Sequence, residues 1–148
     1  MRGLTPIVSF YNYNYSHAVQ NYIGKPYVLG QDGPNSYDCS GTVIAGIRDS
    51  ANPEFQDYTA DELYNKYINH LSSPGGPGTL IFYDNNEVPG STHIDHVATY
   101  VGNGKITDAN PVQGDVHLNP SSYESNYTAK NGGTVYYGQL NWGEIMHF

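Results

Sequence analysis

The sequence predicts an α+β fold, in which N-terminal helices pack on an antiparallel β-meander. Two observations carry this prediction. Residues 39–71 place apolar side chains at helical spacing, whereas short runs rich in β-forming residues, separated by Gly and Asn turns, follow from residue 79 onward. Helices that precede a set of consecutive strands are typical of the α+β class. The length of 148 residues fits one domain, 1–148, with a single hydrophobic core.

The first third of the chain is predicted to hold an extended arm and two helices. Residues 1–15 end in a Tyr/Asn alternation without an evident helical period, which favours an extended arm. Ser16 is a suitable N-cap for a short helix that runs through Ile23. A second helix, over residues 39–49, presents Val43, Ile44 and Ile47 on one apolar face and ends before Asn52-Pro53.

The rest of the chain is predicted to hold one more helix and then strands. Thr59 and Glu62 have the spacing of a capping box, which opens a helix with apolar positions as far as Leu71. Gly102-Asn103-Gly104 predicts a tight hairpin turn. Residues 111–133 read as a long polar connection that walls a substrate groove. The predicted strands cover residues 79–83, 95–101, 105–108, 134–139 and 144–147.

Composition excludes several function classes. The net charge of −8 with only six Lys and Arg residues argues against nucleic-acid binding. No run approaches the roughly 18 apolar residues that span a bilayer, and the N-terminus does not read as an intact secretion signal. The 15 tyrosines suit binding of sugars or peptides, but Tyr is also a good strand former. Composition gives no oligomeric state.

Cys39 is the strongest candidate for a reactive residue. It is the only cysteine, so no intramolecular disulfide forms, and it stands where a Gly/Pro/Asn/Ser-rich loop meets the predicted helix. The positive end of a helix dipole favours a thiolate at such a position. A lone cysteine with a distant histidine, here His96, outlines a nucleophile and its base. The alternative is a buried cysteine that acts only as a small hydrophobic residue.

His96 begins a predicted strand on which it shares one face with Ala98 and Tyr100. Asp108 lies at the end of the strand that returns after the hairpin, so its carboxylate can approach His96. A carboxylate that accepts an imidazole N–H orients the ring and stabilises the imidazolium. The other interpretation of Asp108 is an ordinary residue at a strand end.

Four motifs follow one another along the chain, at Gly24–Tyr27, Asp38–Gly41, residues 77–83 and residues 96–104. In this order they resemble the NlpC/p60 family of bacterial cell-wall cysteine peptidases, which are small papain-like domains. Gly24–Tyr27 is similar to the family's Gly-x-Pro-Tyr segment, and Asp38–Gly41 to its Asp-Cys-Ser-Gly motif. Residues 77–83 resemble the Pro-Gly-Asp-Leu strand, and residues 96–104 resemble the strand that carries the histidine. The resemblance runs from about Tyr15 to Pro111 and implies a papain-like NlpC/p60 fold.

The resemblance also implies roles for individual residues. Cys39 matches the nucleophile, His96 the base, and Asp108 the third polar position, where the family more often has His, Asn or Gln. Tyr27 matches a tyrosine whose hydroxyl helps the Cys39 backbone N–H to hold the oxyanion. The candidate substrate-binding residues adjoin this pair in sequence: Asp38, Ser40 and Asp95. No cofactor and no metal are implied.

The activity implied by the resemblance is hydrolysis of an amide in the peptidoglycan stem peptide, at the bond from γ-D-glutamate to the diamino acid. The departures from the family pattern concern substrate preference more than reaction type: Leu29, Gln31, Thr79 and Ala98. Residues 32–40 also resemble the nucleophile loop of phage lysin domains from the same superfamily. This similarity implies a secreted or wall-associated enzyme, or a phage-encoded one released at lysis, and keeps an N-acetylmuramoyl-L-alanine amidase as an alternative.

Three further hypotheses are weaker. A metal site at His93 and His96, with His117, conflicts with the opposite faces that residues three apart occupy on a strand. A non-catalytic, tyrosine-rich wall-binding module does not need both Cys39 and His96. A transferase or deamidase toxin would share the same acyl-enzyme chemistry, so the sequence leaves it open.

Overall fold

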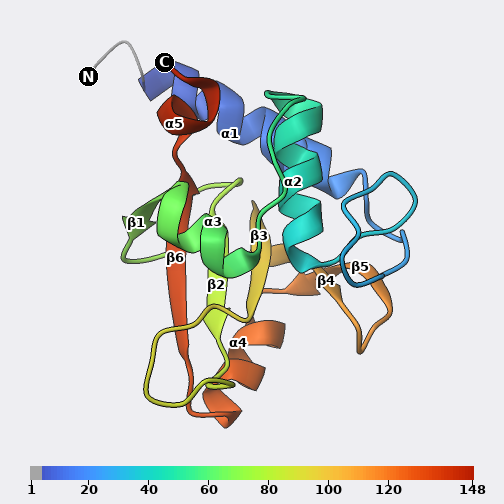
Figure 1. The fold of residues 1–148 in the computed structure, drawn as a ribbon, viewed down its shortest axis with the longest axis vertical. Helices are drawn as coiled ribbons and strands as arrows, with labels where there is room; N and C mark the ends of the chain where they lie inside the picture. The colour runs from blue at the N-terminus through green and yellow to red at the C-terminus, as the bar shows by residue number, and fades with distance from the viewer. Residues whose placement is uncertain (1–4) are drawn as a thin grey trace.

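A six-stranded antiparallel sheet forms the centre of the computed structural model, which describes residues 5–148. The strand order is β1-β6-β2-β3-β4-β5, so β6 returns to lie between β1 and β2 (Figure 1). The elements follow the chain in the order α1 (Thr5–Gln20), α2 (Cys39–Ser50), α3 (Ala60–Lys66), β1 (Ile68–Leu71), β2 (Leu80–Asp84), β3 (His96–Gly102), β4 (Lys105–Asn110), β5 (Asp115–Pro120), α4 (Ser122–Lys130), β6 (Thr134–Leu140) and α5 (Trp142–Met146). The predicted α+β class is confirmed.

The two faces of the sheet bury different sets of side chains because neighbours on a strand point in opposite directions. On β2, Leu80 and Phe82 join the main core with α1, α2 and α3, whereas Ile81 and Tyr83 pack with Ala98 on the other face. The helix α4 contacts β2 and β6 at the opposite end of the molecule from α1 (Figure 1). The sheet therefore separates the large helical core from a smaller layer that contains α4.

The predicted extended arm at residues 1–15 is wrong over residues 5–15, which form most of α1; residues 1–4 lie outside the described part. Tyr11, Tyr15 and Val19 are four apart and share one helical face, which the Tyr/Asn alternation conceals. Tyr15 and Val19 are fully buried, and the Tyr11 ring stacks on Trp142 at 5.2 Å. Tertiary packing thus stabilises a helix whose residues have low intrinsic propensity.

Three further expectations differ from the structure. The third helix ends at Lys66, and Ile68–Leu71 form β1 because they pair with β6. The connection over residues 111–133 contains β5 and α4. The predicted strand over residues 144–147 falls instead largely in α5, where Asn141 caps the helix by accepting a hydrogen bond from the Glu144 N–H at 3.2 Å. Pairing with a distant strand thus decides β1, whereas a local cap supports α5.

Other expectations are confirmed. Strands β2, β3, β4 and β6 lie within one or two residues of their predicted bounds, and α2 extends one residue beyond its predicted end. The capping box of Thr59 and Glu62 is formed. Asn103 and Gly104 both adopt positive φ angles, 55° and 70°, as a tight hairpin turn between twisted strands requires.

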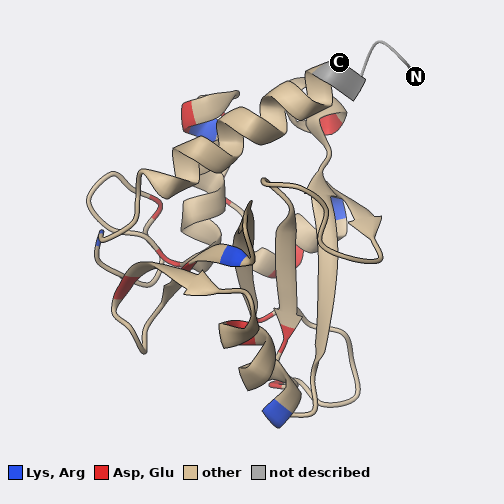
Figure 2. Ribbon diagram, turned by 180° about the vertical axis from the view of Figure 1, so that it is seen from behind, with Lys and Arg blue, Asp and Glu red and all other residues tan. Residues whose placement is uncertain are grey.

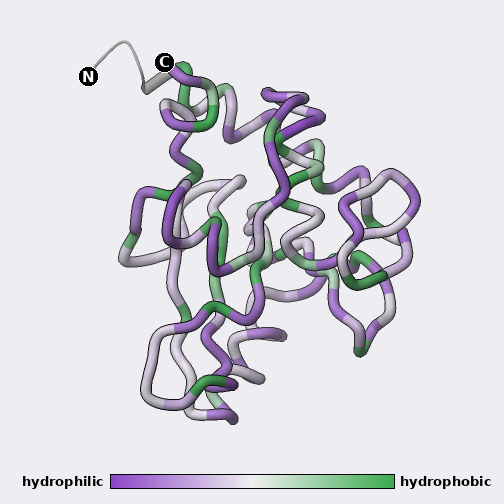
Figure 3. Tube along the Cα trace, viewed as in Figure 1, coloured by the Kyte–Doolittle hydropathy of each residue, from purple (hydrophilic) through white to green (hydrophobic). Residues whose placement is uncertain are grey.

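Basic residues and hydrophobic residues are both dispersed along the described chain. The Lys and Arg residues of the described chain lie far apart on the ribbon, so residues 5–148 form no basic patch (Figure 2). Hydrophobic stretches are short and alternate with polar ones along the trace (Figure 3). No helix in residues 5–148 is both long enough and apolar enough to cross a bilayer.

Candidate active site

Cys39 is the first residue of α2, and the local sequence holds it there. Asp38 is the N-cap residue, and its carboxylate accepts hydrogen bonds from the Gly41 N–H at 2.7 Å and from the Gly30 N–H at 2.8 Å. This carboxylate therefore ties the preceding loop to the start of the helix. Gly41 is required at its position because a Cβ atom there would lie 2.0 Å from the Gln31 carbonyl oxygen.

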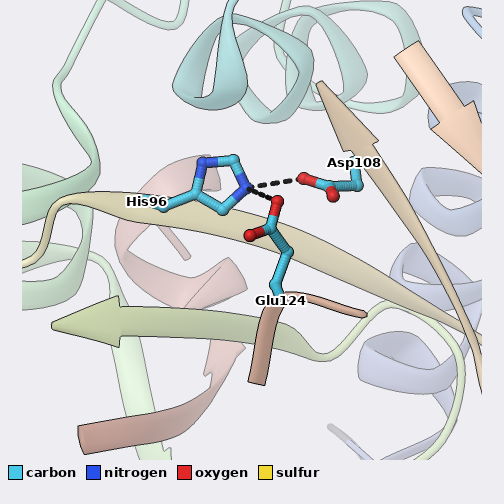
Figure 4. A group of neighbouring side chains, drawn as sticks. All are labelled: His96, Asp108 and Glu124. Carbon is cyan, nitrogen blue, oxygen red and sulfur yellow. Dashed lines mark hydrogen bonds and ion pairs between the residues drawn. The ribbon is translucent and has the colours of Figure 1, made fainter. Parts of the chain in front are cut away.

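His96 and Asp108 meet across the neighbouring strands β3 and β4. The distance between His96 Nε2 and Asp108 Oδ1 is 2.5 Å (Figure 4). The other carboxylate oxygen of Asp108 accepts hydrogen bonds from the side-chain amides of Asn110 and Asn119, each at 3.2 Å. Asp108 is only 1% exposed. The carboxylate is thus fixed by three donors and holds the imidazole through one nitrogen.

Glu124 is a third group at the same imidazole, and it is not among the residues that the sequence predicted for the site. Its Oε2 atom lies 3.2 Å from His96 Nε2, and it approaches from α4 (Figure 4). Ser121 and Glu124 have capping-box spacing, which indicates a helix start. The pattern carries no information that the helix turns this carboxyl toward His96. In the structure Ser121 makes no side-chain capping hydrogen bond.

The surroundings of His96 favour its charged form. Burial disfavours the imidazolium, but hydrogen bonds to Asp108, Cys39 and Glu124 outweigh burial and raise the pKa of His96 well above its ordinary value. Burial alone would raise the pKa of Asp108, but the hydrogen bond and charge of His96 lower it. Because Nε2 faces the carboxylates, Nδ1 is the nitrogen left for Cys39.

Tyr27 and Asp38 share a cavity with the Cys39–His96 pair. Burial and the nearby Cys39 and Asp38 raise the pKa of the half-buried Tyr27. The cavity has a volume of about 610 Å³, which suits a short peptide. One wall is formed by the end of β4, the segment after it and α4: Asn110, Pro111, Val112, Tyr123, Glu124, Asn126, Tyr127 and Lys130. The segment expected to wall a groove thus does so mainly as a helix.

The other candidate substrate-binding residues differ in placement. The Asp95 carboxylate lines the cavity but accepts a hydrogen bond from the Asn85 N–H at 2.8 Å, which fixes the loop after β2. Ser40 is half-buried, and its hydroxyl lies 3.4 Å from Asp38 Oδ1. Asp95 therefore reaches the cavity, whereas Ser40 is turned toward the cap of α2.

The side chains of His96, Asp108 and Glu124 are better arranged to share protons than to bind a metal ion. Ligand atoms of His96, Asp108 and Glu124 lie within 4.8 Å of one another, which is close enough for a cation. Both carboxyl groups, however, face the same nitrogen, and the hydrogen bonds that raise the pKa of His96 favour an N–H at this position. His93 and His117 are not part of this group, since they lie beside Asp95 and Asp115 respectively.

Comparison with known proteins decides the family. The model of the NlpC/P60 family matches residues 24–135. The chain belongs to the NlpC/P60 family. These 112 of 148 residues contain Cys39, His96, Asp108 and Glu124. Solved NlpC/p60 domains include one from the peptidoglycan hydrolase SagA and one from RipD of Mycobacterium tuberculosis, which is a non-catalytic protein adapted to peptidoglycan binding.

Individual NlpC/P60 proteins agree with this assignment. "Probable endopeptidase p60" of Listeria monocytogenes is 34% identical over 95 residues, which are 61% of this chain and 17% of that protein. NlpC1 from Trichomonas vaginalis superposes with a TM-score of 0.68 at 24% identity, over 88% of this chain and 44% of that one. The NlpC/p60 domain of peptidoglycan hydrolase SagA superposes with a TM-score of 0.59 at 21% identity, over 84% of this chain and 96% of that one. The chain spans about a sixth of the curated relative's length.

Proposed function

We propose that this chain is a peptidoglycan hydrolase that cleaves the amide between γ-D-glutamate and the diamino acid of the stem peptide. The observation that carries the proposal is Cys39 at the start of α2, beside a largely buried His96 that Asp108 holds. This pair opens onto a cavity of about 610 Å³. Action at the cell wall, after secretion or release at lysis, follows from the same proposal.

The first half-reaction is acyl transfer to Cys39. The thiolate attacks the amide carbon, so a C–S bond forms and the carbonyl electrons move to oxygen. The Cys39 backbone N–H, which α2 leaves without a partner within the helix, and the Tyr27 hydroxyl stabilise this oxyanion. As the carbonyl re-forms, the C–N bond breaks and His96 gives its proton to the leaving amine.

The second half-reaction returns the enzyme to its starting state. Neutral His96 takes a proton from water, and the hydroxide attacks the thioester carbon. The C–S bond then breaks, the stem-peptide carboxylic acid leaves and gives its proton to solvent, and the thiolate and imidazolium form again. Asp108 remains ionised throughout and keeps the imidazole ring oriented.

Mass spectrometry of defined muropeptides tests the proposal. Wild-type protein is expected to give fragments that end at γ-D-glutamate, and Cys39→Ala to lose this activity by about 10³-fold or more. Ser50→Ala, at the far end of the same helix, is the matched control and is expected to keep it. Release of intact stem peptide from glycan would change the assignment to an amidase. If wild type cleaves no muropeptide, the hydrolase proposal is wrong.

A further inference from the structure

Glu124 is a buried carboxyl for which the proposed reaction has no use. It lies outside the four sequence motifs, on the first turn of α4, and is only 8% exposed. An acidic residue in a first turn ordinarily lies in solvent and favours the helix through the macrodipole. Glu124 instead points inward, to within 3.2 Å of His96 Nε2 (Figure 4). Its burial requires a partner that compensates for lost hydration.

The positions of the carboxyl oxygen atoms indicate how Asp108 and Glu124 can lie so close together. Asp108 Oδ2 is occupied by the amides of Asn110 and Asn119, so Oδ1 is the atom that faces His96 and Glu124. Two carboxylates this close repel each other unless a proton or a cation lies between them. A protonated Glu124 can donate its O–H to Asp108, while the imidazole N–H donates to the same carboxylate.

We propose that Glu124 is a positioning residue that shares a proton with Asp108 at acidic pH and, once ionised, places a second negative charge beside His96. The inference rests on the proposed role of His96 as the partner of Cys39. Its consequence is that His96 stays an imidazolium to a higher pH than one carboxylate alone would allow. The alkaline limb of the pH–activity profile therefore lies at a higher pH.

The pKa shifts agree in direction with this arrangement. Burial raises the pKa of Glu124, the hydrogen bond from His96 opposes this, and Asp108 adds to the increase. The pKa of Asp108 is lowered, so Asp108 is the member of the pair that ionises first. As the pH rises, Glu124 ionises second, and the number of negative carboxylate charges that face His96 increases from one to two.

Other groups around His96 do not titrate in the same range. The ring of Tyr83, on β2, lies 5.5 Å from the His96 ring, and burial raises the pKa of its hydroxyl far above neutrality. Tyr123 lies next to Glu124 on α4, and burial raises its pKa as well. Burial likewise raises the pKa of Tyr27. The charges that face His96 therefore come from Asp108, Glu124 and the Cys39 thiolate.

The test is the titration of the His96 imidazole by NMR in wild type and Glu124→Gln, with the resonance assigned from His96→Asn. Glutamine keeps the shape and can still donate to Asp108, but it carries no charge. The midpoint of His96 is expected to fall by about one pH unit. Glu144→Gln, which removes an exposed first-turn glutamate from α5, is the matched control and is expected to leave the midpoint unchanged.

A second measurement keeps the inference testable if Glu124→Gln does not fold. In wild-type protein with carbon-13 in the glutamate carboxyl groups, one resonance is expected to titrate above the ordinary glutamate range. Neither measurement uses substrate, so a failure to cleave muropeptides leaves both results valid. An unchanged His96 midpoint in a folded Glu124→Gln variant, or glutamates that all titrate normally, would overturn the inference and leave Glu124 a structural residue of α4.

Discussion

At the scale of single residues, Asp108 can orient the His96 imidazole because both of its carboxylate oxygen atoms accept hydrogen bonds from fixed donors. One oxygen binds His96 Nε2, and the other accepts from Asn110 and Asn119. A carboxylate with three donors cannot rotate away from the imidazole without breaking hydrogen bonds. This fixation occupies Nε2 and leaves Nδ1 as the His96 nitrogen available to the Cys39 thiol.

Replacement of Asp108 by Asn tests this role. The amide keeps the size of the side chain but removes the charge that stabilises the imidazolium, so kcat/KM is expected to fall by about 10²-fold or more. The matched control is Asp115→Asn, in which the lost carboxylate binds His117 at 3.0 Å in a more exposed Asp–His pair. Kinetics on the cleaved muropeptide would contradict the prediction if both variants lost activity equally.

At the scale of elements, the first turn of α2 places the thiol. Asp38 closes the loop over residues 30–41 by accepting from two backbone N–H groups, one on each side of Cys39. Helix α3, which carries none of the site residues, has a similar cap at Thr59. The two caps therefore offer a comparison between a helix that bears the nucleophile and one that does not.

Removal of each cap separates stability from activity. Asp38→Ala and Thr59→Ala are each expected to lower the free energy of unfolding by about 1 kcal/mol, because each leaves one backbone N–H of the first turn without its acceptor. Only Asp38→Ala is expected to reduce kcat/KM. Asp38→Asn retains a good cap and should recover both properties; an Asn variant that unfolds normally but stays inactive would point to the charge of Asp38 instead. Urea unfolding and steady-state kinetics give the two values.

At the scale of the whole molecule, two layers meet at the site. Helix α2 reaches it from the main core, whereas α4 reaches it at the other end of the fold (Figure 1). The contact between α1 and α2 fixes the first layer, since Tyr15 packs at Gly46 and its hydroxyl lies 2.8 Å from Thr99 Oγ1 on β3. The position of Cys39 thus depends on how closely two helices and a strand pack.

Gly46→Ala tests that packing. The added Cβ atom would lie 2.6 Å from side-chain atoms of both Tyr15 and Val19, so the helices must separate. Overpacking of this kind costs about 1–3 kcal/mol, which exceeds the helix-propensity gain of about 1 kcal/mol. Gly143→Ala in α5, where the nearest atom lies at 3.5 Å, is the control and is expected not to destabilise the protein. A thermal melt that shows Gly46→Ala unchanged would disprove close packing here.

The sequence by itself determined the features that depend on local patterns. Apolar spacing predicted α2, the capping box predicted the start of α3, and Gly102-Asn103-Gly104 predicted the hairpin that brings Asp108 back toward His96. These features are legible because neighbours in sequence create them. The candidate roles of Cys39 and His96 came from a lone cysteine with a distant histidine, that of Asp108 from the hairpin, and all three also from the resemblance to the NlpC/p60 motifs.

Only the tertiary structure decided the remainder. Helix α1 is stabilised by burial of Tyr15 and Val19, and β1 exists because β6 lies beside it. Glu124 enters the site because α4 packs at the end of β2 and β6 and turns this carboxyl toward His96. A residue 28 positions from His96 in sequence becomes its neighbour through the path of the chain, and no local pattern encodes the cost of burying its charge or the partners that compensate for it.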